Sequence, residues 1–117
     1  MMENKLYAKI SVQLFTDDKC FGPGIAALLH QVKKTHSLRS AAASMGMAYS
    51  KAWTILKNCE EHLGFKLLHS TIGGKNGGGA TLTDDAEKIL RAYDEYCAEI
   101  KEYSDKLIDE KFSFYIQ

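Results

Sequence analysis

The chain has 117 residues, of which 45% are hydrophobic, enough for one domain with a modest core. Its 15 basic and 15 acidic side chains cancel, which excludes a uniformly basic, non-specific nucleic-acid binder. The sequence contains no apolar run of about 18 residues and no secretory signal, so a protein with no membrane contact and a cytoplasmic location is expected.

The charges are unevenly distributed along the chain. Residues 30–82 carry seven basic side chains and two acidic ones, whereas residues 83–117 carry ten acidic and five basic ones. A polyanion responds to charges within about 8 Å in physiological salt. The middle of the chain is therefore a candidate nucleic-acid contact, with chance segregation of charge as the alternative.

The first elements predicted are a strand and a helix. Apolar and polar residues alternate from Leu6 to Phe15, which predicts a half-buried strand, and residues 16–22 read as a loop. Pro23 then opens a helix that ends at His36, because proline costs least in a first helical turn. Its buried stripe is expected to be Ile25, Leu28, Leu29 and Val32.

Two helices separated by a tight turn follow, over about residues 37–64. Ser37 is the expected N-cap of the first helix, and Gly46 is expected to end it in the left-handed conformation. The second helix covers about residues 48–63 and ends at Gly64. The residues expected to face inward are Leu38, Ala41, Ala42 and Met45 on the first helix, and Ala52, Ile55, Leu56, Cys59 and Leu63, with Trp53 beside them, on the second.

The second of these helices has the polar face of a DNA-reading element. Short polar and basic side chains in its first half could reach base edges in a major groove about 12 Å wide. An ordinary amphipathic surface helix is the alternative. The DNA-facing side chains expected here are Tyr49, Ser50, Lys51, Thr54 and Lys57, with Ser37, Arg39 and Ser40 from the preceding helix.

A glycine-rich hairpin is expected over about residues 66–82. Strands at 66–72 and 80–82 flank a seven-residue turn that contains five glycines. A phosphate-binding P-loop is disfavoured because Lys75 is followed by Asn76 and the turn leads into a strand. A wing with Lys75 and Asn76 along a DNA backbone fits better, and a plain flexible linker is the alternative.

A long helix, capped by Thr83, is expected to reach about Glu110. Its apolar residues recur at alternating steps of four and three, which is the spacing of a heptad seam between two copies. Packing of the same stripe on the chain's own core is the alternative. The predicted dimer interface consists of Ile89, Tyr93, Tyr96, Ile100, Tyr103 and Leu107.

Neither a metal site nor an active site is predicted. The three cysteines are widely spaced, and Cys59, His62 and His69 are not shown to converge as at least three ligands must. No nucleophile is paired with a base in sequence, so no enzyme and no cofactor are expected.

Five segments together resemble the amino-terminal DNA-binding domain of the molybdate-responsive ModE family, itself similar to the helix-turn-helix of LysR-type regulators. The most specific are the GGKNGGG turn that leads into Leu82 and Thr83, and the YSKAW segment at 49–53. The other segments lie at 22–29, 37–42 and 64–68. The similarity covers residues 6 to about 105.

The resemblance implies an α+β winged helix-turn-helix in one domain over residues 1–117, acting as a homodimeric transcription regulator on double-stranded, palindromic DNA. Ala48 stands where many relatives have an N-cap serine, and Asn76 replaces a frequent glycine. The chain stops at Gln117, before the oxyanion-binding domains of molybdate sensors, so no small-molecule ligand is expected. Alternatives are a LysR-like fragment with an unknown effector, a protein-interaction module with the same fold, and a metal or oxyanion sensor.

Overall fold

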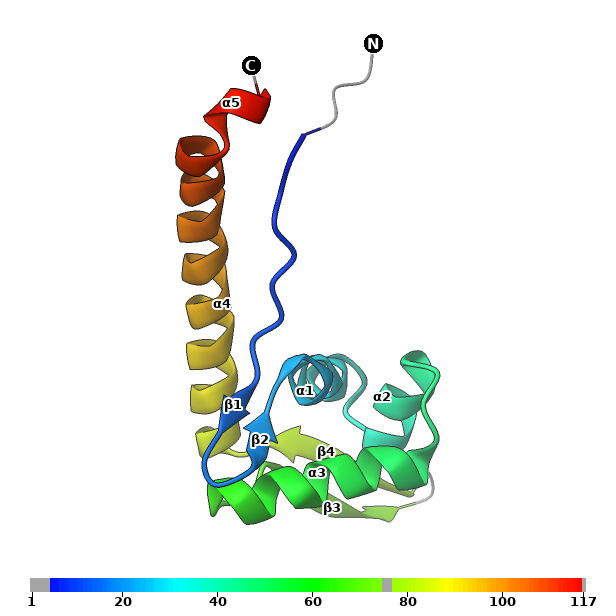
Figure 1. The fold of residues 1–117 in the computed structure, drawn as a ribbon. Helices are drawn as coiled ribbons and strands as arrows, with labels where there is room; N and C mark the ends of the chain where they lie inside the picture. Colours follow the sequence, from blue (N-terminus) through cyan, green and yellow to red (C-terminus); the bar gives the residue numbers. More distant parts are fainter. Residues whose placement is uncertain (1–4, 75–76, 117) are drawn as a thin grey trace.

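The computed structural model describes residues 5–74 and 77–116 (Figure 1). It is a winged helix-turn-helix of mixed helix and strand, as the sequence predicts. Along the chain the elements are β1 (Leu14–Phe15), β2 (Lys19–Phe21), α1 (Pro23–Thr35), α2 (Leu38–Ser44), α3 (Tyr49–Leu63), β3 (Leu68–Gly74), β4 (Gly77–Leu82), α4 (Asp84–Lys111) and α5 (Ser113–Ile116).

The core is built around α1. Leu28, Leu29 and Val32 of this helix are completely buried, and α2, α3, β4 and α4 all contact it. Small residues let the neighbouring helices come close, since Ala41 and Ala42 of α2 and Ala52 of α3 are buried too. The predicted stripe of α1 is thus confirmed.

The turn between α2 and α3 follows the predicted backbone. The Ser37 hydroxyl accepts the Ser40 amide N–H at 3.1 Å, which caps α2. Gly46 in the turn and Gly64 after α3 both have positive φ, 65° and 86°, a region where a side chain would be strained. Ala48 gives α3 no side-chain cap, in line with its departure from the family pattern.

Trp53 corrects one expectation. Its side chain was predicted to lie beside the inward-facing residues of α3, but it is 47% exposed. The buried residues of α3 are Ala52, Leu56 and Cys59, and Trp53 lies off that stripe. The hydrophobic character of Trp53 suggested burial, whereas its position on α3 directs the side chain away from the core.

The wing is an antiparallel hairpin of β3 and β4, with Leu68 opposite Leu82 and Ser70 opposite Ala80. Its strands continue further into the glycine-rich turn than predicted, to Gly74 and from Gly77. The Ala80 N–H donates to the carbonyl of His36 at 2.9 Å, which fastens β4 to the end of α1. Lys75 and Asn76 lie outside the described residues.

The predicted amino-terminal strand is largely wrong. Only Leu14 and Phe15 of the alternating run pair, with β2, which itself lies in the predicted loop. A strand needs a partner, and β2 offers only three residues. Residues 5–13 instead run beside α4 (Figure 1), where the Tyr93 hydroxyl donates to the Val12 carbonyl at 2.8 Å.

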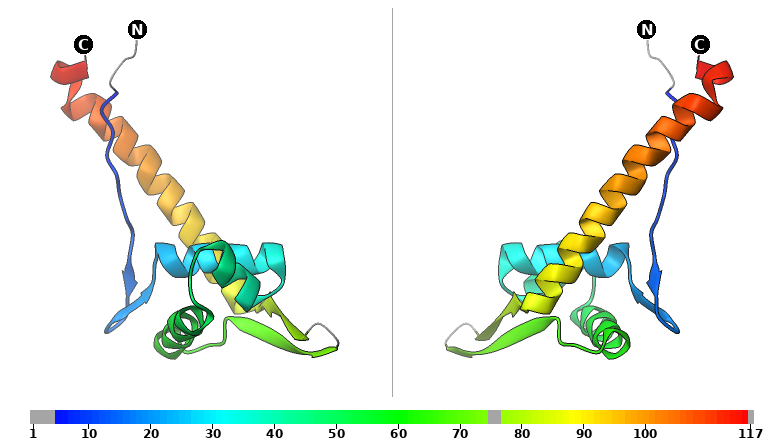
Figure 2. Two further views of the ribbon diagram at one scale, coloured as in Figure 1. Left: turned by 90° about the vertical axis from the view of Figure 1, so that its right-hand side faces the viewer. Right: turned by 90° about the vertical axis from the view of Figure 1, so that its left-hand side faces the viewer.

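The first half of α4 packs on the body and the second half leaves it (Figure 2). Ala86, Leu90 and Tyr93 are buried, and Glu87 and Asp94 pair with Lys33 and His30 of α1 at 2.9 and 2.8 Å. The 28-residue helix is about 42 Å long, so it extends past the core. The radius of gyration is 18.0 Å, against about 13 Å for a compact chain of this length.

No helix in the described part of the chain is long and apolar enough to cross a lipid bilayer. The short helix α5 was not predicted.

Thr83 joins the wing to α4 and gives a test of this fold. Its hydroxyl accepts the Ala86 N–H and donates to the Lys66 carbonyl at 2.7 Å. Thr83→Ala should lower the free energy of unfolding by about 1–2 kcal/mol, because the cap and the second bond are both lost. Urea denaturation followed by circular dichroism measures it, with exposed Thr81→Ala as control. Equal losses in both variants would contradict this role.

Candidate nucleic-acid interface

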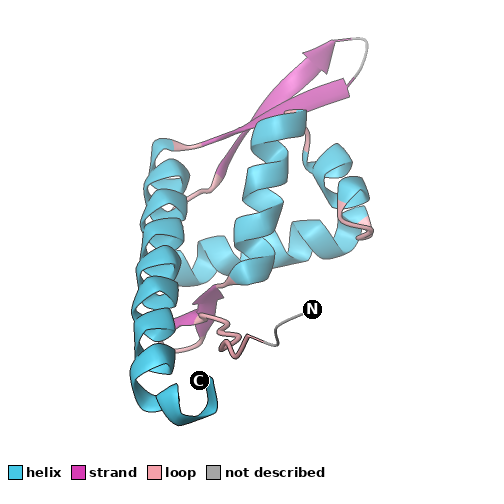
Figure 3. Cartoon of the chain, turned by 90° about the horizontal axis from the view of Figure 1, so that it is seen from above, coloured by secondary structure: helices cyan, strands magenta, loops and turns pink. Residues whose placement is uncertain are grey.

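A polar cleft of about 760 Å³ lies between the start of α2, the outer face of α3 and the wing. Helix α3 and the wing lie at the same end of the molecule (Figure 2). The wing extends beyond the helices (Figure 3). Basic side chains line the cleft from three segments: Arg39 from α2, Lys57 from α3 and Lys66 from the segment between α3 and the wing. This arrangement concentrates positive charge from separate elements on one concave surface.

Aromatic rings orient two of these cations. The guanidinium of Arg39 lies 4.2 Å from the centroid of the Tyr49 ring, so a side chain of α2 rests on one of α3. The Lys57 ammonium lies 5.4 Å from the centroid of the Trp53 ring. Contacts of this kind hold a cation by attraction to the ring face without neutralising its charge. The ring contacts therefore leave the positive charge of both side chains in place.

Glu60 is the acidic member of the cleft, and its side chain is only 10% exposed. One carboxylate oxygen accepts the Leu67 N–H at 2.7 Å, which fixes the turn between α3 and the wing. The other lies 3.3 Å from the Lys57 ammonium. Glu60 thus has a structural role, while its charge partly offsets that of Lys57.

The residues predicted to face DNA fall into three groups. Ser37, Arg39, Ser40, Tyr49 and Lys57 line the cleft. Ser50, Lys51 and Thr54 are exposed on α3 but do not line it, and the Thr54 hydroxyl donates to the Ser50 carbonyl at 2.9 Å. Lys75 and Asn76 belong to the part of the wing that the structure does not describe.

Sequence reasoning missed several residues of the cleft, namely Trp53, Lys66, His69 and Ser70. Trp53 stands four residues after Tyr49 and four before Lys57, so helical spacing alone could have placed it on their face. The wing residues carried no comparable signal, because their side chains face the cleft only once the hairpin folds back beside α3.

The cysteine and the histidine of α3 both donate hydrogen bonds to backbone carbonyls. Burial raises the pKa of Cys59 to about 12, so it stays a thiol, which donates to the Cys20 carbonyl. The pKa of His62 is raised chiefly because its ring donates to the Asn58 carbonyl. Among the described residues, no three His, Cys, Asp or Glu side chains are grouped as a metal ion would require.

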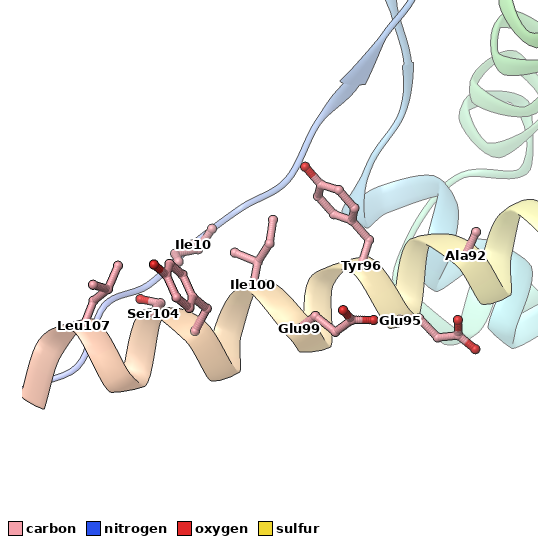
Figure 4. Close-up of a pocket in the computed structure, with 9 residues that line it drawn as sticks. Ile10, Ala92, Glu95, Tyr96, Glu99, Ile100, Ser104 and Leu107 are labelled. Atoms are coloured by element: carbon pink, nitrogen blue, oxygen red, sulfur yellow. The ribbon is translucent and has the colours of Figure 1, made fainter.

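A second surface, which we call the α4 groove, lies on the projecting half of that helix and has a volume of about 640 Å³. Tyr96, Ile100 and Leu107 point to one side of α4, where the segment carrying Ile10 runs past, and Glu95 and Glu99 point to the other (Figure 4). Tyr103 also lines the groove and is 65% exposed.

The first part of the predicted seam belongs to the chain's own core. Tyr93 is 6% exposed, its ring meets Phe21 edge to face at 5.1 Å, and burial raises its pKa to about 12. Ile89 packs against the same core. A heptad pattern does not show whether its apolar residues pack on the same chain or on a partner. Here the first turns of α4 pack on the core, and the later turns project from it. The expectation that Ile89 and Tyr93 lie in a dimer seam is therefore corrected, because both pack on the chain's own core.

Comparison with known proteins identifies the module. Residues 26–87 match the model of the family described as bacterial regulatory helix-turn-helix protein, lysR family. The chain belongs to this family. The matched LysR-family segment contains α2, α3 and the wing, and it begins inside α1 and ends in the first turn of α4.

Relatives of this LysR-family chain confirm the resemblance to ModE. It is 35% identical over 89 residues to "Transcriptional regulator ModE" of Haemophilus influenzae, covering 76% of this chain and 33% of the relative. "DNA-binding transcriptional dual regulator ModE" of Escherichia coli K12 is 29% identical, with coverages of 76% and 32%. "Molybdenum-pterin-binding protein MopB" of Rhodobacter capsulatus is 37% identical over 67 residues, with 57% and 25%.

The chain spans about a third or less of the length of these relatives. Two of the three are named transcriptional regulators.

Two substitutions in the cleft should change the affinity for a random-sequence duplex at low salt in opposite directions. Lys57→Ala should weaken binding and reduce the salt dependence by about one unit of slope, because one phosphate contact is lost. Glu60→Gln should strengthen binding about fivefold, the equivalent of roughly 1 kcal/mol, since the amide keeps an acceptor for Leu67 without the charge. Fluorescence anisotropy over a salt series measures both.

Two matched variants control for charge alone. Lys106→Ala removes a lysine from the projecting half of α4, and Glu61→Gln removes an exposed acid from α3 outside the cleft. Neither should change the affinity by as much as its partner variant. If the members of each pair behaved alike, the cleft would not be the DNA contact.

Proposed function

We propose that this chain is a sequence-specific transcription regulator that binds operator DNA as a homodimer in the cytoplasm. The observation that carries the proposal is the cleft, which gathers cations from α2, α3 and the approach to the wing beside the exposed face of α3. Family membership supports the same reading, because the matched segment covers these elements.

In the proposed complex, the first turns of α3 enter the major groove. Ser50, Lys51 and Thr54 are exposed there and can reach base edges, which carry sequence information. Arg39, Lys57 and Lys66 border the cleft and would contact phosphates, which set the position of the protein on the duplex. The wing, with Lys75 and Asn76, would follow the flanking backbone.

Selection of bound duplexes from a random pool tests this function most directly. A regulator of this kind should enrich a palindrome whose half-sites are about one helical turn apart, roughly 34 Å, because two copies related by a two-fold axis read the two strands alike. Failure to enrich any sequence at any salt concentration would contradict the proposal and favour an interaction module.

The homodimer is proposed from the α4 groove. Tyr96 is 53% exposed and Ile10 is 49% exposed, although both are large and apolar or aromatic. Together with Ile100, Tyr103 and Leu107 they line a mainly apolar groove, with Glu95 and Glu99 at its border. A second copy would remove this surface from water, and the tyrosine hydroxyls could stay hydrated at its rim. The corrected seam is therefore Tyr96, Ile100, Tyr103 and Leu107.

Tyr96→Glu tests the pairing surface. A carboxylate among the apolar side chains of the groove should give a monomer in sedimentation velocity, because burying an unpaired charge is costly. Ala98→Glu is the matched control, since it adds the same charge to exposed α4 surface outside the groove and should leave the dimer intact. An unchanged mass for Tyr96→Glu would place the interface elsewhere.

A further inference from the structure

The single tryptophan of the chain lies on the DNA-facing side of α3. Trp53 lines the cleft, and its side chain is 47% exposed. The core takes Ala52, Leu56 and Cys59 from this helix, so the buried stripe does not contain the indole. Such a large ring exposed in the middle of a polar surface leaves apolar area in contact with water that a ligand could cover.

The surroundings of Trp53 point to a base edge as the ligand rather than a phosphate. The cations beside it supply phosphate contacts, and the Lys57 ammonium lies 5.4 Å from the centre of the indole ring. One turn earlier, Tyr49 is covered by the Arg39 guanidinium at 4.2 Å. Both rings thus have a cation nearby, but Trp53 is the more exposed of the two, at 47% against 38% for Tyr49, and its cation lies farther from the ring.

The major groove offers one apolar group to such a ring. Each base edge there presents hydrogen-bond donors or acceptors, and only thymine adds a methyl group, at C5. Contact with that methyl would remove apolar surface of both partners from water. An indole has one N–H donor and no acceptor, so it cannot make the paired hydrogen bonds by which amide or guanidinium groups select adenine or guanine.

We propose that Trp53 selects thymine at one position of each half-site by contact between its indole ring and the C5 methyl group. The inference rests on the proposed function, because it requires α3 to lie in the major groove. It adds a specificity-determining residue and the chemical group that this residue reads.

The test uses the full chain and the palindrome obtained by selection. Each thymine of a half-site is replaced in turn by deoxyuridine, which removes the methyl and leaves every hydrogen-bonding group of the base unchanged. One position should lose about fourfold in affinity per half-site, the equivalent of roughly 0.8 kcal/mol for one buried methyl-sized group. In Trp53→Ala the same replacement should have no effect.

Trp53→Phe keeps an apolar ring and should retain a penalty at the same position. It also covers the case in which Trp53→Ala fails to fold, which circular dichroism would reveal. An equal uracil penalty in Trp53→Ala and the parent, or an enriched half-site without thymine, would overturn the assignment. These results leave the regulator role standing, whereas absence of any enriched sequence would overturn that role as well.

Discussion

One face of α1 forms the centre of the core, and helices α2, α3 and α4 and the wing pack against it. Its residues Leu28, Leu29 and Val32 are completely buried. The small buried side chains of α2 and α3, Ala41, Ala42 and Ala52, fit against this face. Removal of apolar surface from water is the main stabilising term. The angle between α2 and α3 depends on this packing. So does the cleft, since its walls are the outer sides of elements whose inner sides contact the core.

Backbone hydrogen bonds then fix the corner where α3, the wing and α4 meet. The Glu60 carboxylate accepts the Leu67 N–H, and the Thr83 hydroxyl donates to the Lys66 carbonyl. The His36 carbonyl accepts the Ala80 N–H. Each bond satisfies a backbone group that a tight corner would otherwise leave without a partner. The fold therefore explains why a glutamate lies in a cleft whose other charged side chains are cations.

Local signals in the sequence predicted most of the fold. The caps Ser37 and Thr83, the left-handed Gly46 and the stripe of α1 depend on neighbours within a few residues, and all are confirmed. The strand predicted over residues 6–15 was wrong except at Leu14 and Phe15, because strand pairing depends on a partner that local pattern does not reveal.

The candidate site was predicted less completely than the fold. Sequence reasoning identified Arg39 and Lys57, because charge and helical spacing are local properties. It misjudged Trp53 and Tyr93, whose exposure depends on which elements pack over them. It gave no reason to single out Glu60, because the amide that this residue binds lies across a turn. The anchoring of the wing and the burial of Tyr93 therefore required three-dimensional information.

The separation of charge along the molecule has a kinetic consequence. Residues 30–82 carry an excess of five positive charges and residues 83–117 an excess of five negative ones, in a molecule 61 Å long. Such a particle has no net attraction to a distant polyanion, but it experiences a torque in the field of the duplex. It should rotate so that α3 and the wing face the duplex and the acidic helix α4 points away from it. Electrostatic alignment before contact speeds productive encounters at low ionic strength. A chain with no net charge can therefore still associate rapidly with a duplex in a defined orientation.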